Sequence, residues 1–471
     1  MLFRSPNIIL LLSDDQGWSG LSTPMHPELA GASSERIRTP NIATLGRDGL
    51  RFSQAYSAAP VCSPSRAGIQ TGKNPAALHW TKAARSVSPE DGYRLIPPVS
   101  ARMLPDEEVT VAEVLRRAGY TTAHFGKWHL GGGGPGQHGY DVHDGDTSNQ
   151  DAAPHKDPNP VDIFGMVERA EAFMKSALED ERPFFAQLSF HALHYPENAS
   201  ARNREAVEPR LPRANDKEVG RAALTQDLDE GIARILAVLD ELELAESTFV
   251  IYMADNGAKP NNGQLEGGKG DLWEAGIRVP MIVRGPGVEP GSVSRVPVVG
   301  FDLFPTFLEW ARDEEPLPPG VEGGSLADLL RGGASEVERP QPFLAFHFPH
   351  YQGLGGPQSA LIQGDLKLLR LYEEEEPRLF DLALDPGERA PLDDDEARER
   401  LAGLLDAHLE SIGAHLPREN PAFDAEAPQP ERKRGRAGAR TDRGRGDRGE
   451  RGSRGGRKRK GGDEDSESPG S

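Results

Sequence analysis

The chain of 471 residues contains a single cysteine, Cys62. One cysteine excludes an internal disulfide, so the fold must rest on the burial of apolar side chains. It also argues against a zinc site, because such sites draw on several cysteine or histidine ligands. A lone cysteine is either a small core residue or, where histidine partners lie elsewhere in the chain, a candidate nucleophile.

Long hydrophobic runs are missing as well. No run approaches the roughly 20 residues that a helix needs to cross a bilayer. The run from Ile8 to Leu12 has five residues, fewer than the about 7 to 15 in the apolar core of a signal peptide. We therefore expect a buried strand here and no export signal in the chain as given. The compartment stays open: cytoplasmic as given, or periplasmic or secreted if the true start lies upstream.

Positive charge is scarce in most of the chain. The net charge is −20, yet between Arg432 and Lys460 there are 14 basic residues and 3 acids, so residues 1 to 431 carry −27. The body is thus acidic and is followed by a basic tail. Such a tail binds polyanions through charge alone, but it is more often a solvated terminus, and we expect no nucleic-acid partner.

Strand patterns alternate with helical patterns from residue 6 to about 345. "NIILLLS", "PFFAQLSFHA" and "TFVIYMADNG" are typical of buried strands, and "TVAEVLRRAGY" is typical of a helix capped by Thr110. This alternation predicts an α/β domain over residues 1–341, with a large, mostly parallel mixed sheet sandwiched by helices.

The pattern changes after residue 341. Residues 342–416 contain three short strand patterns joined by turns and then a helical pattern, which predicts a smaller C-terminal α+β subdomain with an antiparallel sheet and one helix. Residues 417–471 are rich in Pro, Arg, Gly and Ser. They offer little to bury, so we expect a disordered tail.

Charged or chelating side chains follow four of the predicted strands. In open α/β sheets, ligands bind beyond the carboxyl ends of the strands, so these groups are candidates for one site. They are Asp14 and Asp15, Lys127 and His129, His194, and Asp255 and Asn256. The carboxylate and amide oxygens suit Ca²⁺ or Mg²⁺, although Asp and Asn after a strand often only close turns. We interpret His194 as catalytic and its neighbour His191 as structural.

The motifs around these residues resemble those of the sulfatases. "CSPSR", which begins at Cys62, matches the Cys-x-Pro-Ser-Arg signature in which the cysteine is oxidised to formylglycine. The other similar segments are "PNIILLLSDDQGW", "GYTTAHFGKWHLG", "HALHYPE", "ADNG", "GGKGDLWEAGIRVP" and "LFDLALDPGE". They occur in register from about residue 6 to about residue 410, which leaves only the tail outside the resemblance.

The resemblance implies a reaction and a cofactor. In the family, one hydroxyl of the formylglycine hydrate attacks sulfur, and deprotonation of the other then releases sulfate. One Ca²⁺ per subunit would be bound by Asp14, Asp15, Asp255 and Asn256 together with modified residue 62. A formylglycine-generating enzyme would be needed for maturation.

The resemblance also implies roles for individual side chains. Arg66 would steady the hydrate, Lys127 and Lys269 would hold sulfate oxygens, His129 would accept a proton, and His194 would donate one to the leaving alcohol. For substrate binding we add three further candidates to Lys127, His194 and Lys269. They are Ser148, His347 and His350. Residues 80 to 104 and 197 to 220 are expected to line the pocket.

The leading hypothesis is a sulfuric ester hydrolase that acts on sulfated carbohydrates or aryl sulfates. Two alternatives stay open at this point. The same scaffold also serves phosphate and phosphonate monoester hydrolases, since tetrahedral sulfate resembles phosphate. A non-catalytic glycan-binding protein would follow if Cys62 stayed an unmodified thiol.

Overall fold

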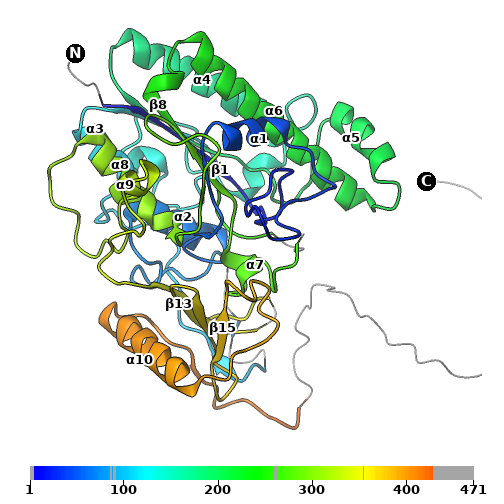
Figure 1. Cartoon of the computed structure of the whole chain (residues 1–471), viewed down its shortest axis with the longest axis vertical. Helices are drawn as coiled ribbons and strands as arrows, with labels where there is room; N and C mark the ends of the chain where they lie inside the picture. The colour runs from blue at the N-terminus through cyan, green and yellow to red at the C-terminus, as the bar shows by residue number, and fades with distance from the viewer. Residues whose placement is uncertain (1–4, 85–86, 89–91, 259–262, 354, 428–471) are drawn as a thin grey trace, which may run out of the picture. The chain divides into compact units, whose positions relative to one another are not determined.

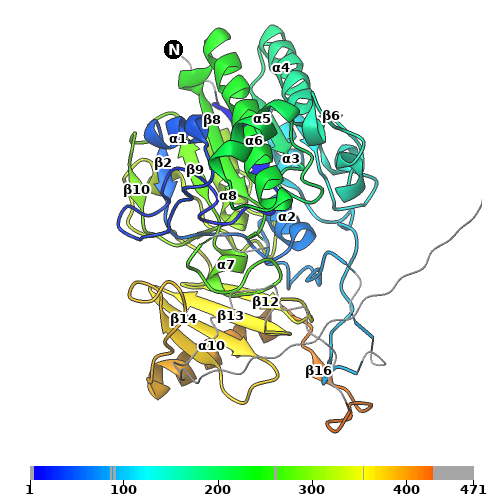
Figure 2. The same ribbon diagram turned by 90° about the vertical axis from the view of Figure 1, so that its right-hand side faces the viewer.

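The computed structural model describes residues 5–84, 87–88, 92–258, 263–353 and 355–427. These residues belong to one compact unit (Figures 1 and 2). The predicted disorder of residues 428–471 lies outside the described residues. None of the described helices is both long and apolar enough to cross a membrane.

The unit is built on an eight-stranded sheet with the order β10-β2-β9-β8-β1-β7-β5-β6. In that order the strands are Val293–Ser294, Leu50–Phe52, Met281–Arg284, Thr248–Ala254, Asn7–Ser13, Phe184–Ser189, Thr121–Gly126 and Val142–His143. Only β9 runs antiparallel, against both β8 and β2. The predicted large, mostly parallel mixed sheet is therefore confirmed.

Apolar side chains of β1 alternate between two cores, one on each face of the sheet. Ile8 and Leu10 belong to one core, and Ile9 and Leu11 belong to the other. This is why the strand is an unbroken apolar run instead of an alternating one. On the face of Ile9 lie α1 (Pro40–Arg47), α4 (Ile163–Glu179) and α6 (Asp216–Glu241). On the face of Ile8 lie α2 (Cys62–Thr71), α3 (Val111–Arg117), α8 (Leu303–Ala311) and α9 (Ala327–Leu330).

Short elements complete this part of the chain. The helix α5 covers Ala201–Val207 and α7 covers Glu274–Ile277, while β3 (Ala55–Tyr56) pairs with β11 (Val298–Val299). Thr110 caps α3 as predicted, since its hydroxyl accepts the backbone N–H of Glu113 and the Glu113 side chain accepts the backbone N–H of Thr110.

A four-stranded antiparallel sheet follows in the C-terminal part, with α10 on one side of it (Figure 2). Its strands are β12 (Leu344–Phe348), β13 (Gln358–Gln363), β14 (Leu366–Leu371) and β15 (Arg378–Asp381), and α10 spans Asp395–Ser411. Leu401 and Leu405 of α10 pack on one face, and Tyr56 of the main part packs on the other. The predicted α+β subdomain is confirmed, while the limits 341/342 and 416/417 stay proposals.

Part of the predicted tail differs from expectation. Arg418 and Glu419 form β16, which pairs antiparallel with β4 (Leu95–Ile96). Asn420 adds a bond from its side-chain amide to the carbonyl oxygen of Tyr93. Backbone pairing and this amide, and not burial of apolar side chains, hold the segment, so composition gave no sign of it.

A buried ionic cluster joins the small sheet to the main part. The Lys367 ammonium on β14 lies 2.9 Å from a Glu274 carboxylate oxygen of α7 and 2.8 Å from one of Glu388. All three side chains are fully buried. Removing the cation would leave Glu388 beside Glu274 in the interior, with Arg278, 3.2 Å from Glu274, as the remaining cation of the cluster.

We therefore expect Lys367→Met, which keeps the length of the side chain, to lower the free energy of unfolding by about 3 to 5 kcal/mol. Denaturant titration measures this change. The control is Lys175→Met, which removes a surface ion pair with Glu171 on α4, and it should change the free energy of unfolding far less. Equal effects in the two variants would contradict a stabilising role for the buried cluster.

His347 of β12 is buried on the face that α10 covers. Phe346 and Phe348 point toward the main part, whereas Ala345 contacts the α10 core, so His347 lies on the α10 side. Its Nδ1 lies 2.6 Å from the Ser359 hydroxyl and its Nε2 lies 3.1 Å from the His415 carbonyl oxygen. Burial lowers the pKa of this imidazole to about 4, so the ring is neutral in the fold.

A neutral buried histidine makes stability depend on pH. The unfolded chain takes up a proton below about pH 6.5, and the folded ring does so only near its pKa of about 4. The free energy of unfolding should therefore fall as the pH drops through this window, by up to about 1.4 kcal/mol per pH unit for this group. Denaturant titrations at several pH values should give a shallower slope for His347→Gln. The exposed His143→Gln is the control, and an unchanged slope in His347→Gln would refute the assignment.

Candidate active site

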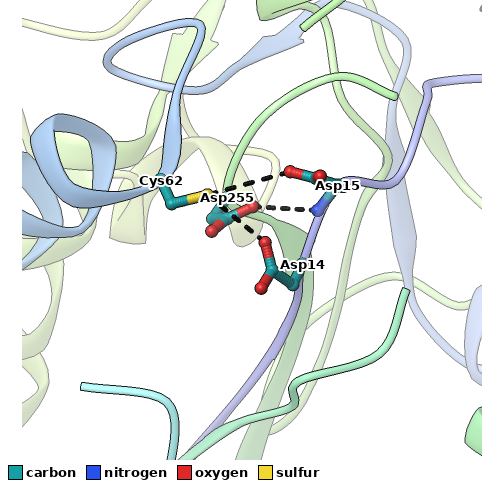
Figure 3. Close-up of side chains that lie close together, drawn as sticks. All are labelled: Asp14, Asp15, Cys62 and Asp255. Atoms are coloured by element: carbon teal, nitrogen blue, oxygen red, sulfur yellow. Dashed lines mark hydrogen bonds between the residues drawn. The ribbon is translucent and has the colours of Figure 1, made fainter. Parts of the chain in front are cut away.

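Three carboxylates and the only cysteine meet at one edge of the large sheet (Figure 3). The strands β1 and β8 are parallel neighbours, with Ser13 opposite Ala254. Asp14 and Asp255 therefore leave the sheet side by side. Ligand atoms of Asp14, Asp15, Cys62 and Asp255 all lie within 4.8 Å of one another, so the predicted convergence of the acidic doublets with the cysteine is present.

Cys62 is the first residue of α2 and is almost fully buried. Its Sγ lies 3.4 Å from Oδ1 of Asp14 and 3.8 Å from Oδ1 of Asp15. Burial, followed by the Asp14 carboxylate, raises the pKa of the thiol well above its ordinary value. The side chain is thus held as a neutral thiol beside the acids.

Three cations offset the carboxylates. Lys127 Nζ lies 2.5 Å from Asp14, Lys269 Nζ lies 2.6 Å from Asp15, and Arg66 Nε donates to Asp255 at 2.9 Å. Burial opposes the charge on Asp14, but Lys127 and Arg66 together hold the pKa of its carboxyl well below the usual range. For Asp255, burial and then Asp14 raise the pKa. The site is therefore a compact set of alternating charges.

Asn256 has a buried side-chain oxygen that fits a role as a cation ligand. Its Nδ2 donates to Asp15 at 2.7 Å, but its Oδ1 is buried and has no hydrogen-bond partner among the described residues. Such orphaned oxygens are rare in protein interiors. The donor set of three carboxylates and this amide oxygen is the type that a hard divalent cation prefers.

Two histidines flank this cluster. His194 Nε2 lies 4.0 Å from Asp15, and its Nδ1 lies 2.8 Å from the Tyr195 carbonyl oxygen, so Nδ1 carries a proton. His129 is also buried, and burial followed by Lys127 lowers its pKa to about 3. His191 is buried nearby, and burial followed by Lys127 lowers its pKa to about 4.

A cavity of about 900 Å³ adjoins the cluster and includes Ser63 and His129 in its wall. Much of the predicted segment 80 to 104 lines it, whereas no residue of 197 to 220 does. Ser148 is also in the wall, with its hydroxyl bonded to Gln150 and Asp151.

Two predicted substrate contacts need correction. The structure does not bring His347 and His350 to the cavity wall. His347 faces α10, as described above, and the buried His350 has its Nε2 2.8 Å from the Thr81 hydroxyl. Both imidazoles are therefore buried in the interior.

Sequence reasoning also missed charged residues of the cavity wall. They are Lys82, Arg102, Asp146 and Arg418. Each is a common surface residue type without a motif of its own. Only the position of Lys82 and Arg102 in the segment 80 to 104 gave any signal.

Family models and curated relatives match most of the chain. Residues 6–313 match the family model described as Sulfatase, and residues 268–415 match that of the C-terminal region of N-sulphoglucosamine sulphohydrolase. The chain is 30% identical to N-acetylgalactosamine-6-sulfatase of Canis lupus familiaris, over 83% of this chain and 82% of that protein. It is 28% identical to steryl-sulfatase of Mus musculus, over 90% and 84%.

A solved structure shows the same fold. Ps i-CgsB in complex with k-i-k-neocarrahexaose superposes with a TM-score of 0.71 at 22% identity, over 91% of this chain and 94% of that one. The shared fold agrees with the family match over most of the catalytic part. The chain belongs to the sulfatase family and is a sulfuric ester hydrolase.

Proposed function

We propose that this sulfatase hydrolyses sulfate esters of carbohydrates, using a formylglycine made from Cys62 and one Ca²⁺. The observation that carries the proposal is the cluster at the sheet edge, where Cys62, three carboxylates and two lysines meet beside a cavity. Its volume of about 900 Å³ suits a sugar-sized ligand. The names of N-acetylgalactosamine-6-sulfatase and of the Ps i-CgsB complex support a carbohydrate.

The calcium site would consist of Asp14, Asp15, Asp255 and Asn256 together with residue 62. The orphaned Oδ1 of Asn256 supports this assignment, because a cation would satisfy it. Lys127 and Lys269 already form ion pairs with two of these carboxylates, Asp14 and Asp15. A bound Ca²⁺ polarises a sulfate oxygen and acidifies a neighbouring hydroxyl.

We assign the role of nucleophile to a modified residue 62 and not to the thiol. A formylglycine instead supplies, once hydrated, one hydroxyl to attack sulfur and a second whose deprotonation releases sulfate. A formylglycine-generating enzyme is therefore the proposed maturation partner. Because α2 begins at this residue, its first backbone N–H groups favour an anion there.

Two lysines and Arg66 have proposed roles in sulfate binding and in the geometry of the site. Lys127 and Lys269 would bind sulfate oxygens and offset charge that grows in the transition state. Arg66 holds Asp255 and also donates to the Lys127 carbonyl oxygen at 2.6 Å, so it fixes two sides of the site.

Two histidines would move the protons. The neutral ring of His129 would accept the proton that accompanies sulfate release, and His194 would donate one to the leaving alcohol. The Tyr195 carbonyl oxygen orients His194 so that its Nε2 faces the cluster. Ser148 in the cavity wall is proposed as a weaker sulfate contact.

The modification at residue 62 is testable by mass. When the protein is expressed with a formylglycine-generating enzyme, the peptide containing residue 62 should be about 18 Da lighter than the cysteine form. Cys62→Ala should lower kcat/KM for an aryl sulfate by at least about 1,000-fold, because the nucleophile is lost. Thermal unfolding of the variant shows whether it is folded.

A Cys62→Ala variant with full activity would defeat the mechanism. An aryl phosphate serves as the comparison substrate, and faster turnover of the phosphate by the wild type would favour the phosphate monoester alternative. An unmodified, inactive Cys62 protein that still bound a glycan would favour the glycan-binding alternative.

Calcium removal gives a second test. Chelation should abolish aryl sulfatase activity, and added Ca²⁺ should restore it. Asn256→Ala should weaken Ca²⁺ binding by at least about tenfold in isothermal titration calorimetry, because one oxygen ligand is lost. The control is Asn41→Ala, whose amide contacts Asp229 outside the site, and it should bind Ca²⁺ as the wild type does. Unchanged binding by Asn256→Ala would remove it from the ligand set.

A further inference from the structure

The cavity beside Cys62 has more positive than negative side chains in its wall. The wall contains three cationic side chains, Lys82, Arg102 and Arg418, and one carboxylate, Asp146. This balance is opposite to that of residues 1 to 431, which carry −27. None of these three cations belongs to the charge cluster around Cys62, and the proposed mechanism assigns no role to them.

Lys82 is the most informative of the three, because only 7% of its surface is exposed. Its Nζ donates to the Tyr351 carbonyl oxygen at 3.2 Å and lies 5.5 Å from the centre of the Phe348 ring. No carboxylate among the described residues forms an ion pair with it. Burial lowers its pKa to about 8. A buried ammonium without a counterion is costly, and an anion in the cavity would remove that cost.

Arg102 and Arg418 come from separate parts of the chain. Arg102 is close to Lys82 in the sequence, whereas Arg418 belongs to β16, which pairs with β4. Both arginines line the cavity. Neither arginine side chain has an ion pair with a described residue. A guanidinium binds a sulfate or carboxylate through two parallel hydrogen bonds, so both are available for an anionic ligand.

We propose that Lys82, Arg102 and Arg418 form a second anion subsite, which binds a further sulfate or carboxylate group of the substrate. The subsite is separate from the position where the sulfate ester is cleaved. It rests on the proposed function and narrows it: the substrate is a saccharide with at least two anionic groups. Asp146 in the same wall would accept hydrogen bonds from sugar hydroxyls.

The test compares four substrates of the calcium-loaded, modified enzyme. They are an aryl sulfate, a disaccharide with one sulfate, the same disaccharide with a second sulfate, and one with a sulfate and a carboxylate. The variants are Arg102→Gln, Arg418→Gln and the double variant, with Arg47→Gln on α1 as the control. Each single variant should raise KM for the doubly charged substrates by about tenfold and the double variant by about 100-fold.

The KM for the aryl sulfate and kcat for every substrate should change less than about twofold, because the cleavage site is untouched. Added salt should raise KM more for the doubly charged substrates than for the singly charged ones. A larger effect with the second sulfate than with the carboxylate, or the reverse, identifies which group is bound.

Lys82→Met tests the third cation of the subsite in the same KM measurements. Thermal unfolding shows whether this variant folds. Unchanged KM for both doubly charged substrates in the double arginine variant would overturn the subsite. So would a wild type that shows no preference for them over the singly sulfated disaccharide. Failure of the wild type to hydrolyse any of the four sulfates would instead overturn the proposed function.

Discussion

Mutual repulsion of three carboxylates governs the structure around Cys62. Parallel pairing of β1 with β8 forces Asp14 and Asp255 to leave the sheet as neighbours, and Asp15 follows directly. Like charges at this separation are unfavourable unless cations lie among them. Three cations from other segments form ion pairs with the acids and offset this repulsion: Lys127, Lys269 and Arg66. The sheet fixes the acids, and the acids in turn hold these three cations by ion pairs.

The C-terminal sheet supports this arrangement from outside the site. Lys269 lies a few residues before α7, and Glu274 of that helix bonds Lys367 of β14. Glu388 accepts the backbone N–H of Glu274 at 2.6 Å, and Gln358 accepts that of Leu272 at 2.8 Å. The small sheet therefore holds the segment that carries Lys269. It contributes to the site by orienting a cation, without itself supplying the His347 and His350 contacts that the sequence suggested.

Sequence reasoning worked where local chemistry decides position. Asp14 and Asp255 could be placed together because each ends an apolar run that fits only a doubly covered strand, and the motifs around Cys62 are specific. It failed for His347, since the covering of both faces of β12 is a tertiary property. It also failed for Arg418, because two strand residues within a Pro- and Arg-rich segment leave no periodic pattern.

The pairing of β16 with β4 bears on how short a working protein can be. A fragment that stops at the end of the subdomain as composition defines it, at residue 416, would lack the partner strand of Leu95 and Ile96. The segment that precedes Arg102 would then lose its backbone anchor, and the cavity would open on the side of Arg418. Tail deletions in this family member should accordingly leave Asn420 in place, because its side-chain amide donates to the Tyr93 carbonyl oxygen.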